Sequence, residues 1–438
     1  MNSQEYYKEV IHKLRNCFQY NDCIVSIEKE LVKEGYDPAF PAITVLKNKL
    51  KYLTEKRGFQ VHIPAVGAKS QSVLMPMDFE IFLTKDNYKL YTDKKTQKYY
   101  FKQTVPALNF IKKIFTDRGM PFLLDYTPSG GHILFQNPLN QRSTKELQKL
   151  GYLEKDLIKS CQVIDPTNLR RKNGISLEAA SVFSGLGKIA EYISLITMNE
   201  FKDNEETGKL PVTISDSRDN CINLDNSWCE GSPHMRSIRS PFSLHKKNQE
   251  KYGRCDDPPL VDIIGCYYDG GNLDYDADID TVVDCMWDLE KAVEHSRKFS
   301  GMIPCANDSL IDFIGEYKQS DLYAFHQEFD AEKDLNYGEA IYKAKKEKNI
   351  PDWARNILYN PNPSAVQPIN MIGFIYDFVI RAEWAPKHAA NILRDMYMDN
   401  ANGWTQDFVD AYPAEEKANF WGRTFSALAY WNTGKITI

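Results

Sequence analysis

Two acidic residues, Asp78 and Glu80, alternate with apolar residues in the segment 73–83. This alternation predicts a β-strand, in which residues two positions apart point to the same face. The strand would therefore present both carboxylates together, where they repel each other and resist burial. Divalent cations such as Mg²⁺ or Mn²⁺ prefer oxygen ligands and would neutralise such a pair. A half-exposed strand with an acidic outer face is the alternative interpretation.

A second candidate is the run Ser129-Gly130-Gly131-His132 between two apolar segments. The pattern predicts a tight turn that joins a strand at 121–127 to its hairpin partner. Successive glycine amides in a turn can form a nest for an anion, and a serine and a histidine beside it add donors for phosphate oxygens. An ordinary hairpin turn with a half-buried histidine is the alternative.

The third candidate is the stretch 234–247, which mixes basic and apolar residues. After His234, the basic residues of this stretch are Arg236, Arg239, His245, Lys246 and Lys247. Arginine grips phosphate oxygens with two parallel donors, whereas lysine acts as a mobile point charge. A charge run alone is usually a solvated surface, but the interleaved apolar residues predict that half of this stretch is anchored against the core.

Taken in order, these features resemble the archaeo-eukaryotic primase superfamily, which includes primase small subunits and the primase-polymerases of plasmids, viruses and defence systems. The family motif hydrophobic-Asp-x-Asp/Glu is similar to residues 77–80, and its Ser-Gly-x-His turn is similar to residues 129–132. The sequence Arg-Ser-Ile-Arg-Ser-Pro-Phe-Ser-Leu-His at 236–245 resembles a third stretch found in primase small subunits. The resemblance covers roughly residues 73–247.

The resemblance implies template-dependent nucleotidyl transfer, as in a DNA primase or DNA polymerase, on an NTP or dNTP with two Mg²⁺ or Mn²⁺ ions. It implies that Asp78, Glu80 and Asp225 hold the ions, with Asp225 on a short strand at 222–225. Asp165 is the rival third carboxylate, but the proline after it and its distance from the arginines favour Asp225. The implied nucleotide-binding residues are Ser129, Gly130, Gly131, His132, Arg236, Arg239 and His245.

The implied partners are a single-stranded DNA template, a primer strand, and proteins of a replication or defence system. Lys246 and Lys247 would reach the triphosphate or the template. A second basic cluster at 170–172, formed by Arg170, Arg171 and Lys172, would follow a nucleic-acid backbone or form a solvated loop.

Two further features have a favoured structural interpretation. A structural zinc site would use Cys221, Cys229, His234 and Cys255, but their spacing follows no recognised ligand pattern. Four tryptophans in the C-terminal part would stack on single-stranded bases or pack in the core, and core packing is favoured. They are Trp384, Trp404, Trp421 and Trp431.

The elements that must position these residues predict an α+β fold, in which helices flank a mixed or antiparallel sheet. The resemblance implies that this fold is of primase type. Residues 1–55 are expected to be helical, because apolar residues recur there at helical spacing. An Asp-Gly-Gly turn and a run of acids near 268–280 predict a domain boundary. The expected domains are a catalytic one at 1–275 and a helical one at 280–438.

The bulk composition of the 438 residues, with a formal charge of -6, is that of a folded protein without an obvious basic face. This does not favour nucleic-acid binding, but phosphate contacts need only a local stripe of positive charge. The sequence has no secretion signal and no membrane-spanning apolar run, so no membrane partner is expected. The nine cysteines form no C-x-x-C pair and are expected to be reduced thiols in a cytoplasmic or nucleoid-associated protein.

Two other classes of function remain open. A metal-dependent nuclease would also use clustered carboxylates, but it would need neither the triphosphate nest nor the arginine stretch. A non-catalytic nucleic-acid-binding subunit of a replication or defence system would not need the acidic pair. Synthesis from labelled nucleotides on a single-stranded template distinguishes these alternatives.

Overall fold

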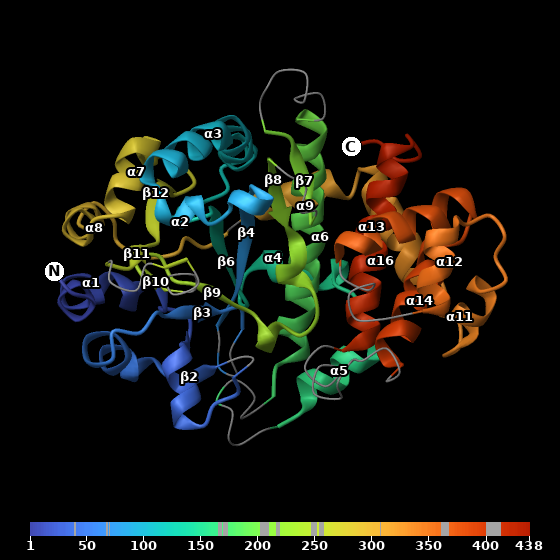
Figure 1. The fold of residues 1–438 in the computed structure, drawn as a ribbon, viewed down its shortest axis with the longest axis horizontal. Coiled ribbons are helices and arrows are strands. Elements are labelled where there is room, and N and C mark those ends of the chain that lie inside the picture. The colour runs from blue at the N-terminus through green and yellow to red at the C-terminus, as the bar shows by residue number, and fades with distance from the viewer. Residues whose placement is uncertain are drawn as a thin grey trace.

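The computed structural model of the chain describes residues 1–38, 41–66, 69, 71–164, 169, 174–201, 210–215, 220–246, 252–253, 258–306, 308–360, 368–399 and 413–438. Over these residues the protein has two main sheets flanked by helices, followed by a helical C-terminal part (Figure 1). The predicted α+β class, with a mixed sheet, flanking helices and a helical C-terminal part, is confirmed.

The larger sheet has seven strands in the order β13-β12-β5-β6-β4-β8-β7. In this order their bounds are Leu273–Asp276, Ile263–Tyr268, Phe122–Thr127, Gly130–Pro138, Ser72–Phe82, Cys221–Asp225 and Val212–Ile214. Neighbouring strands are antiparallel except β7 and β8, which are parallel. The predicted acidic strand is therefore β4, which lies inside the sheet between β6 and β8.

One face of β4 belongs to the hydrophobic core. Phe79 lies on this face and meets Tyr126 of β5 edge-to-face at 6.3 Å between ring centroids. Phe101 of helix α3 (Lys94–Thr116) stacks on Tyr126 at 5.8 Å. Helix α6 (Leu177–Glu200) also contacts β4. Because strand residues alternate between faces, these contacts leave Asp78 on the opposite face.

The smaller sheet has four antiparallel strands in the order β2-β1-β3-β9. Their bounds are Ala42–Leu46, Cys23–Ile27, His62–Pro64 and Ser237–Arg239. A two-stranded pair, β10 (Leu244–His245) and β11 (Leu260–Val261), follows β9. The basic stretch thus becomes edge strand β9 and strand β10, and it is anchored to the core by the buried Phe242 and Leu244.

The prediction that residues 1–55 are helical is correct for α1 (Ser3–Cys17) and wrong for β1 and β2. The side chain of Asn2 caps α1 by accepting hydrogen bonds from the amides of Gln4 and Glu5. The segment 42–46 contains Ile43, Thr44 and Val45, and β-branched side chains favour strands. Its pairing with β1 prevails over the helical spacing of its apolar residues.

The predicted boundary near 268–280 is instead a hairpin and a helix packed on the larger sheet. Asp269 starts the turn between β12 and β13, since its carboxylate accepts hydrogen bonds from the amides of Gly271 and Asn272 at 2.7 and 2.6 Å. Two helices follow, α7 (Ile279–Met286) and α8 (Leu289–Ser296). They contact α3 and α1 respectively, and Asp280 of α7 pairs with Lys102 of α3 at 2.8 Å. The first packing unit therefore extends beyond residue 280.

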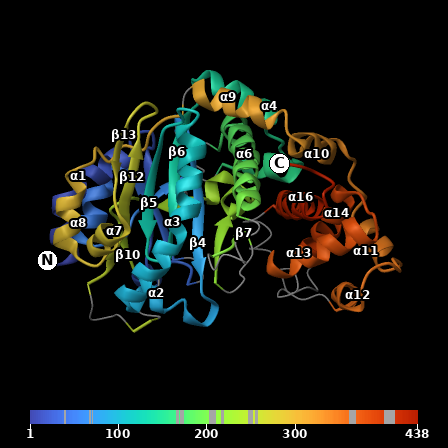
Figure 2. The same cartoon turned by 90° about the horizontal axis from the view of Figure 1, so that it is seen from above.

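The remaining helices complete the fold. Helix α2 precedes α3, and α4, α5 and α9 lie around α6. The C-terminal helices α10 to α14 and α16 gather beyond α6, on the side away from α1 and α8 (Figure 2). The bounds are Lys89–Thr92 (α2), Arg142–Leu150 (α4), Lys155–Gln162 (α5), Asp308–Tyr317 (α9), Asp321–Ala331 (α10), Glu339–Ala344 (α11), Asp352–Tyr359 (α12), Pro368–Tyr376 (α13), Pro386–Met398 (α14) and Ala414–Asn432 (α16).

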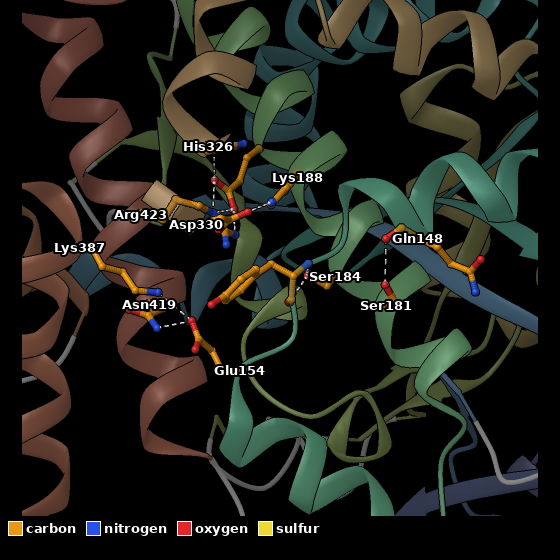
Figure 3. Close-up of polar contacts among 12 residues, drawn as sticks. Gln148, Glu154, Ser181, Ser184, Lys188, His326, Asp330, Lys387, Asn419 and Arg423 are labelled. Carbon is orange, nitrogen blue, oxygen red and sulfur yellow. Dashed lines mark hydrogen bonds and ion pairs between the residues drawn. The ribbon is translucent and has the colours of Figure 1, made fainter. Parts of the chain in front are cut away.

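A buried charged network joins α6 to the C-terminal helices (Figure 3). Arg423 of α16 donates from Nε to Glu191 of α6 at 3.2 Å, and His326 of α10 lies 3.1 Å from the same carboxylate. Burial would raise the pKa of Glu191, but Arg423 and His326 lower it to about 2. Lys188 of α6 pairs with Asp330 of α10 in the same network. Since a buried charge without its partner is costly, this network fixes how α6 meets the C-terminal helices.

Helix α6 is the one described helix whose length and composition would allow it to cross a membrane. Yet 83% of its most apolar window is buried inside the fold. This burial is that of a helix in the core of the fold.

Candidate active site

A cavity of about 750 Å³ is lined by residues of both main sheets. The fold brings together the acidic pair, the turn and part of the basic stretch, which are far apart in the sequence. Among the predicted site residues, those that line the cavity are Asp78, Glu80, Ser129, His132, Arg239, His245 and Lys246.

The acidic pair lies on the cavity wall because of the alternation of β4. Asp78 and Glu80 line the cavity, while Phe79 between them is 2% exposed on the core face. The side chain of Asp78 remains 23% exposed. The geometry predicted for these two carboxylates from the sequence is therefore present.

Asp225 lies directly opposite Asp78 in the register of β8 and β4. Residues in such positions share a face of the sheet and have Cβ atoms about 4.5–5.5 Å apart. The Asp225 carboxylate accepts a hydrogen bond from the Ser227 amide at 2.8 Å, and it is not part of the cavity lining. Asp225 is thus next to the acidic pair, with its carboxylate engaged as the cap of a short helical turn.

Asp78 and Glu80 have the chemistry to hold a divalent cation, because both present carboxylate oxygens to one polar cavity. Over the residues that the structure describes, no group of three or more His, Cys, Asp or Glu side chains is arranged to hold a metal ion. Asp225 would complete a set of three carboxylates if its side chain turned from the Ser227 amide toward Asp78.

His132 connects the cavity to a buried carboxylate behind it. Its Nδ1 lies 2.9 Å from Oδ1 of Asp125, and its Nε2 lies 3.8 Å from Oδ1 of Asp78. Burial alone would lower the pKa of His132, but the carboxylates of Asp125, Asp78 and Asp262 raise it to about 9. His132 is therefore positively charged at neutral pH and adds a cation to a wall that also holds two carboxylates.

Ser129 is held at the cavity by two contacts. Its carbonyl accepts a hydrogen bond from the Ile81 amide at 2.7 Å, and its hydroxyl accepts one from Tyr91 at 2.9 Å. Tyr91 belongs to α2 and lines the same cavity. Tyr91 was not predicted from the sequence, because nothing in its local pattern distinguishes it from a core tyrosine.

The predicted anion nest at Gly130 and Gly131 differs from the structure. The turn consists of Pro128 and Ser129, and both glycines lie in β6, paired on one side with β4 and on the other with β5. A Cβ on Gly130 would lie 1.9 Å from the Phe79 carbonyl oxygen. These glycines therefore permit close strand packing, and neither lines the cavity.

Arg239 reaches the cavity from the smaller sheet. Its Nε donates to Oε1 of Gln60 at 3.2 Å, and its Nη1 lies 3.6 Å from Oδ2 of Asp262. Asp262 is fully buried, and burial raises its pKa against the lowering effect of Arg239. Asp262 thus anchors the guanidinium from behind, as Asp125 anchors His132.

Arg236 points elsewhere and does not line the cavity. Its guanidinium donates to the Glu230 carbonyl, at 2.8 Å from Nε, and lies 3.6 Å from the Glu230 carboxylate. Lys417 of α16 pairs with the same carboxylate at 3.0 Å. The arrangement ties the segment before β9 to the C-terminal helices, and it does not support the predicted nucleotide contact of Arg236.

The cavity is also lined by Glu28, which was not predicted from the sequence. Glu28 is 6% exposed and accepts a hydrogen bond from the Gln60 amide at 2.7 Å. Burial raises the pKa of Glu28, and Lys246 lies 3.7 Å from its carboxylate. His245 places its ring 5.8 Å from that of Tyr91. Glu28 follows β1, and it was not predicted because its place at the cavity depends on the pairing of strands that are distant in the sequence.

The remaining predicted residues lie away from the cavity or outside the described chain. Trp421 and Trp431 are buried, and Trp384 donates to Glu347 at 3.1 Å, so these three pack in the fold. Of the zinc candidates, Cys221 accepts a hydrogen bond from Thr213, Cys229 is buried, and His234 pairs with Ser232. The residues outside the described part are Asp165, Arg170, Arg171, Lys172, Lys247, Cys255 and Trp404.

Comparisons of the chain with protein-family models, with curated proteins and with solved structures found no significant match.

Proposed function

We propose that this protein is a template-dependent nucleotidyl transferase of the primase-polymerase type. The observation that supports this function is the cavity that brings the acidic pair, Asp78 and Glu80, together with the cationic side chains of His132 and Arg239. A site with carboxylates alone would suit many cation-dependent reactions. The added cationic side chains suit a substrate that is itself anionic, such as a nucleoside triphosphate.

In this function the chain's residues have separate tasks. Asp78 and Glu80, with Asp225 beside them, would hold Mg²⁺ or Mn²⁺, which supply charge stabilisation for phosphoryl transfer. The Nε2 of His132 and the guanidinium of Arg239 would donate to phosphate oxygens of the incoming nucleotide. Catalysis in such a site consists mainly of positioning and electrostatic stabilisation.

Behind the cavity, Asp125 and Asp262 keep the two cationic donors in place. A buried partner fixes the direction of each donor before the substrate arrives, so less reorganisation is needed on binding. The Tyr91 hydroxyl does the same for Ser129, which would add a neutral donor for a phosphate oxygen. The site is therefore preorganised for an anion beside the acidic pair.

The test is synthesis by the full-length protein on a primed single-stranded DNA template with labelled nucleotides and Mg²⁺ or Mn²⁺. We expect the wild type to extend the primer, and Asp78→Asn and Glu80→Gln to lose about 100-fold or more, the scale for removing one electrostatic group from a transition state. Asp274→Asn is the matched control, because this exposed carboxylate lies on edge strand β13 of the same sheet.

Two outcomes would replace the proposal. Shortening of the template without nucleotide addition would identify a nuclease. Nucleotide and template binding without turnover in either cation would identify a non-catalytic subunit. Full synthesis by both cavity variants would exclude Asp78 and Glu80 as the catalytic carboxylates.

A further inference from the structure

The helices α11 and α12 carry an unusual share of the exposed aromatic surface. In the described part of the chain, eight tyrosine or tryptophan side chains are exposed, and four of them lie between residues 337 and 359. They are Tyr337, Tyr342, Trp353 and Tyr359, with exposed fractions of 60%, 61%, 45% and 57%. Aromatic rings are normally buried or at interfaces, so this density marks a surface with a binding role.

Two of these rings are in contact with lysines. The Lys346 ammonium lies 3.8 Å from the centre of the Tyr342 ring, and the Lys345 ammonium lies 5.3 Å from that of Tyr359. The Tyr359 hydroxyl donates to the Lys345 carbonyl at 3.2 Å, which holds α12 against the end of α11. These four residues, Tyr342, Lys345, Lys346 and Tyr359, form what we call the α11–α12 patch.

Two acidic residues near the patch, Glu347 and Glu339, have partners within the protein. Glu347 accepts hydrogen bonds from the amides of Lys348 and Asn349 and from Trp384 Nε1. Glu339 pairs with Lys343 at 2.8 Å. Among the described residues, no carboxylate forms an ion pair with Lys345 or Lys346. The charge that the patch presents to a partner is therefore positive.

We propose that the α11–α12 patch binds single-stranded nucleic acid. The two tyrosine rings offer faces on which unstacked bases can lie, and the two lysines offer charge to the phosphates between them. A duplex keeps its bases stacked, so it could use only the lysines. The inference extends the proposed function by naming a second contact for the template strand, but it rests on surface chemistry and not on the catalytic residues.

The test is the binding of a fluorescently labelled oligothymidine strand to the full-length protein, measured by anisotropy without nucleotide. The double variant Tyr342→Ala/Tyr359→Ala should bind at least about 10-fold more weakly, from the energy of base–aromatic stacking. The variant Tyr342→Phe/Tyr359→Phe keeps both rings but loses the hydroxyl contacts with Lys345 and Lys346, so it should bind more tightly than the alanine variant. Tyr99→Ala is the control, since this side chain on α3 is also 61% exposed.

The contribution of Lys345 and Lys346 is measured separately, through the salt dependence of the affinity. For Lys345→Ala/Lys346→Ala, the slope of log affinity against log salt should fall by about 1.4, which is about 0.7 for each lost phosphate contact on a single strand. Lys51→Ala, a 66% exposed lysine near the N-terminus, should leave that slope unchanged.

Unchanged binding in both patch variants would overturn the proposal, and so would an equal loss of affinity for a duplex in the tyrosine variant. If the patch variants bind normally while Asp78→Asn loses synthesis, only the patch assignment fails. If the patch variants weaken strand binding but the wild type shows no synthesis, the binding role of the patch is supported and the nucleotidyl-transfer proposal fails.

Discussion

The imidazole of His132 lies between two carboxylates, with Nδ1 2.9 Å from Asp125 and Nε2 3.8 Å from Asp78. Asp125 is fully buried, whereas Asp78 faces the cavity. This arrangement gives His132 a fixed orientation and a positive charge, because the surrounding carboxylates raise its pKa to about 9 against the effect of burial. Under the proposed function, the binding of an anionic substrate to His132 therefore depends on Asp125, which is buried behind it.

The first prediction concerns pH. Because the pKa of His132 is raised from 6.5 to about 9, its charge is complete below 6.5 and is lost as the pH rises through about 9. Nucleotide affinity and the free energy of unfolding should both fall over this upper range. In Asp125→Asn the loss of affinity should move to lower pH, and His132→Gln should remove this step. Nucleotide titrations and denaturant unfolding across the range measure both effects, and an unshifted step in Asp125→Asn would contradict the coupling.

The second prediction separates two arginines of the same stretch. Arg239→Lys keeps the charge but loses the Nε donor to Gln60 and the planar fork, so the KM for nucleotide should rise about 10-fold, the value of one charge-assisted hydrogen bond. Arg236→Lys should leave the KM unchanged. It should instead lower the free energy of unfolding by about 1–3 kcal/mol, because the Glu230 carbonyl and carboxylate lose a partner. Steady-state kinetics and denaturant unfolding of both variants test this contrast.

The local parts of the site could be predicted from the sequence. The alternation around Asp78 and Glu80 specifies a strand, and Pro128 with Ser129 between apolar runs specifies a hairpin, because these signals involve neighbouring residues only. The approach of Arg239 to this hairpin was expected from the order of motifs and not from any local pattern.

The second layer of the site could not be predicted, for physical reasons. Asp125 lies in an apolar strand, where its role depends on His132 across the β5–β6 pairing. Asp262 acts through Arg239, and Glu28 enters the cavity because β1 pairs with β3, which pairs with the distant β9. The anion nest predicted at Gly130 and Gly131 was wrong for the same reason. A glycine in a turn and a glycine that allows close packing of strands have the same sequence pattern.

The third prediction concerns these glycines. A Cβ at position 131 would lie 2.4 Å from the Asp125 carbonyl oxygen and 2.7 Å from the Phe79 ring. Gly131→Ala should therefore lower the free energy of unfolding by about 1–3 kcal/mol, the usual cost of overpacking. Gly315→Ala in α9 is the control, because a Cβ there meets nothing within 4 Å, and a helical alanine should not destabilise the fold. A nucleotide-binding defect in Gly131→Ala at unchanged stability would favour the anion-nest interpretation instead.

The last prediction concerns Asp225, which has two candidate roles. Its carboxylate caps the turn at Ser227, and its position opposite Asp78 makes it the candidate third ligand for a cation. Asp225→Asn keeps an oxygen that can accept the Ser227 amide but removes the charge, whereas Asp225→Ala removes both. If Asp225 binds the cation, both variants should lose primer extension by about 100-fold. The Ala variant alone should also lose about 1 kcal/mol of stability, the usual contribution of a cap. If both variants extend primers normally, Asp225 is only a cap, and Asp165→Asn becomes the decisive variant for the third carboxylate.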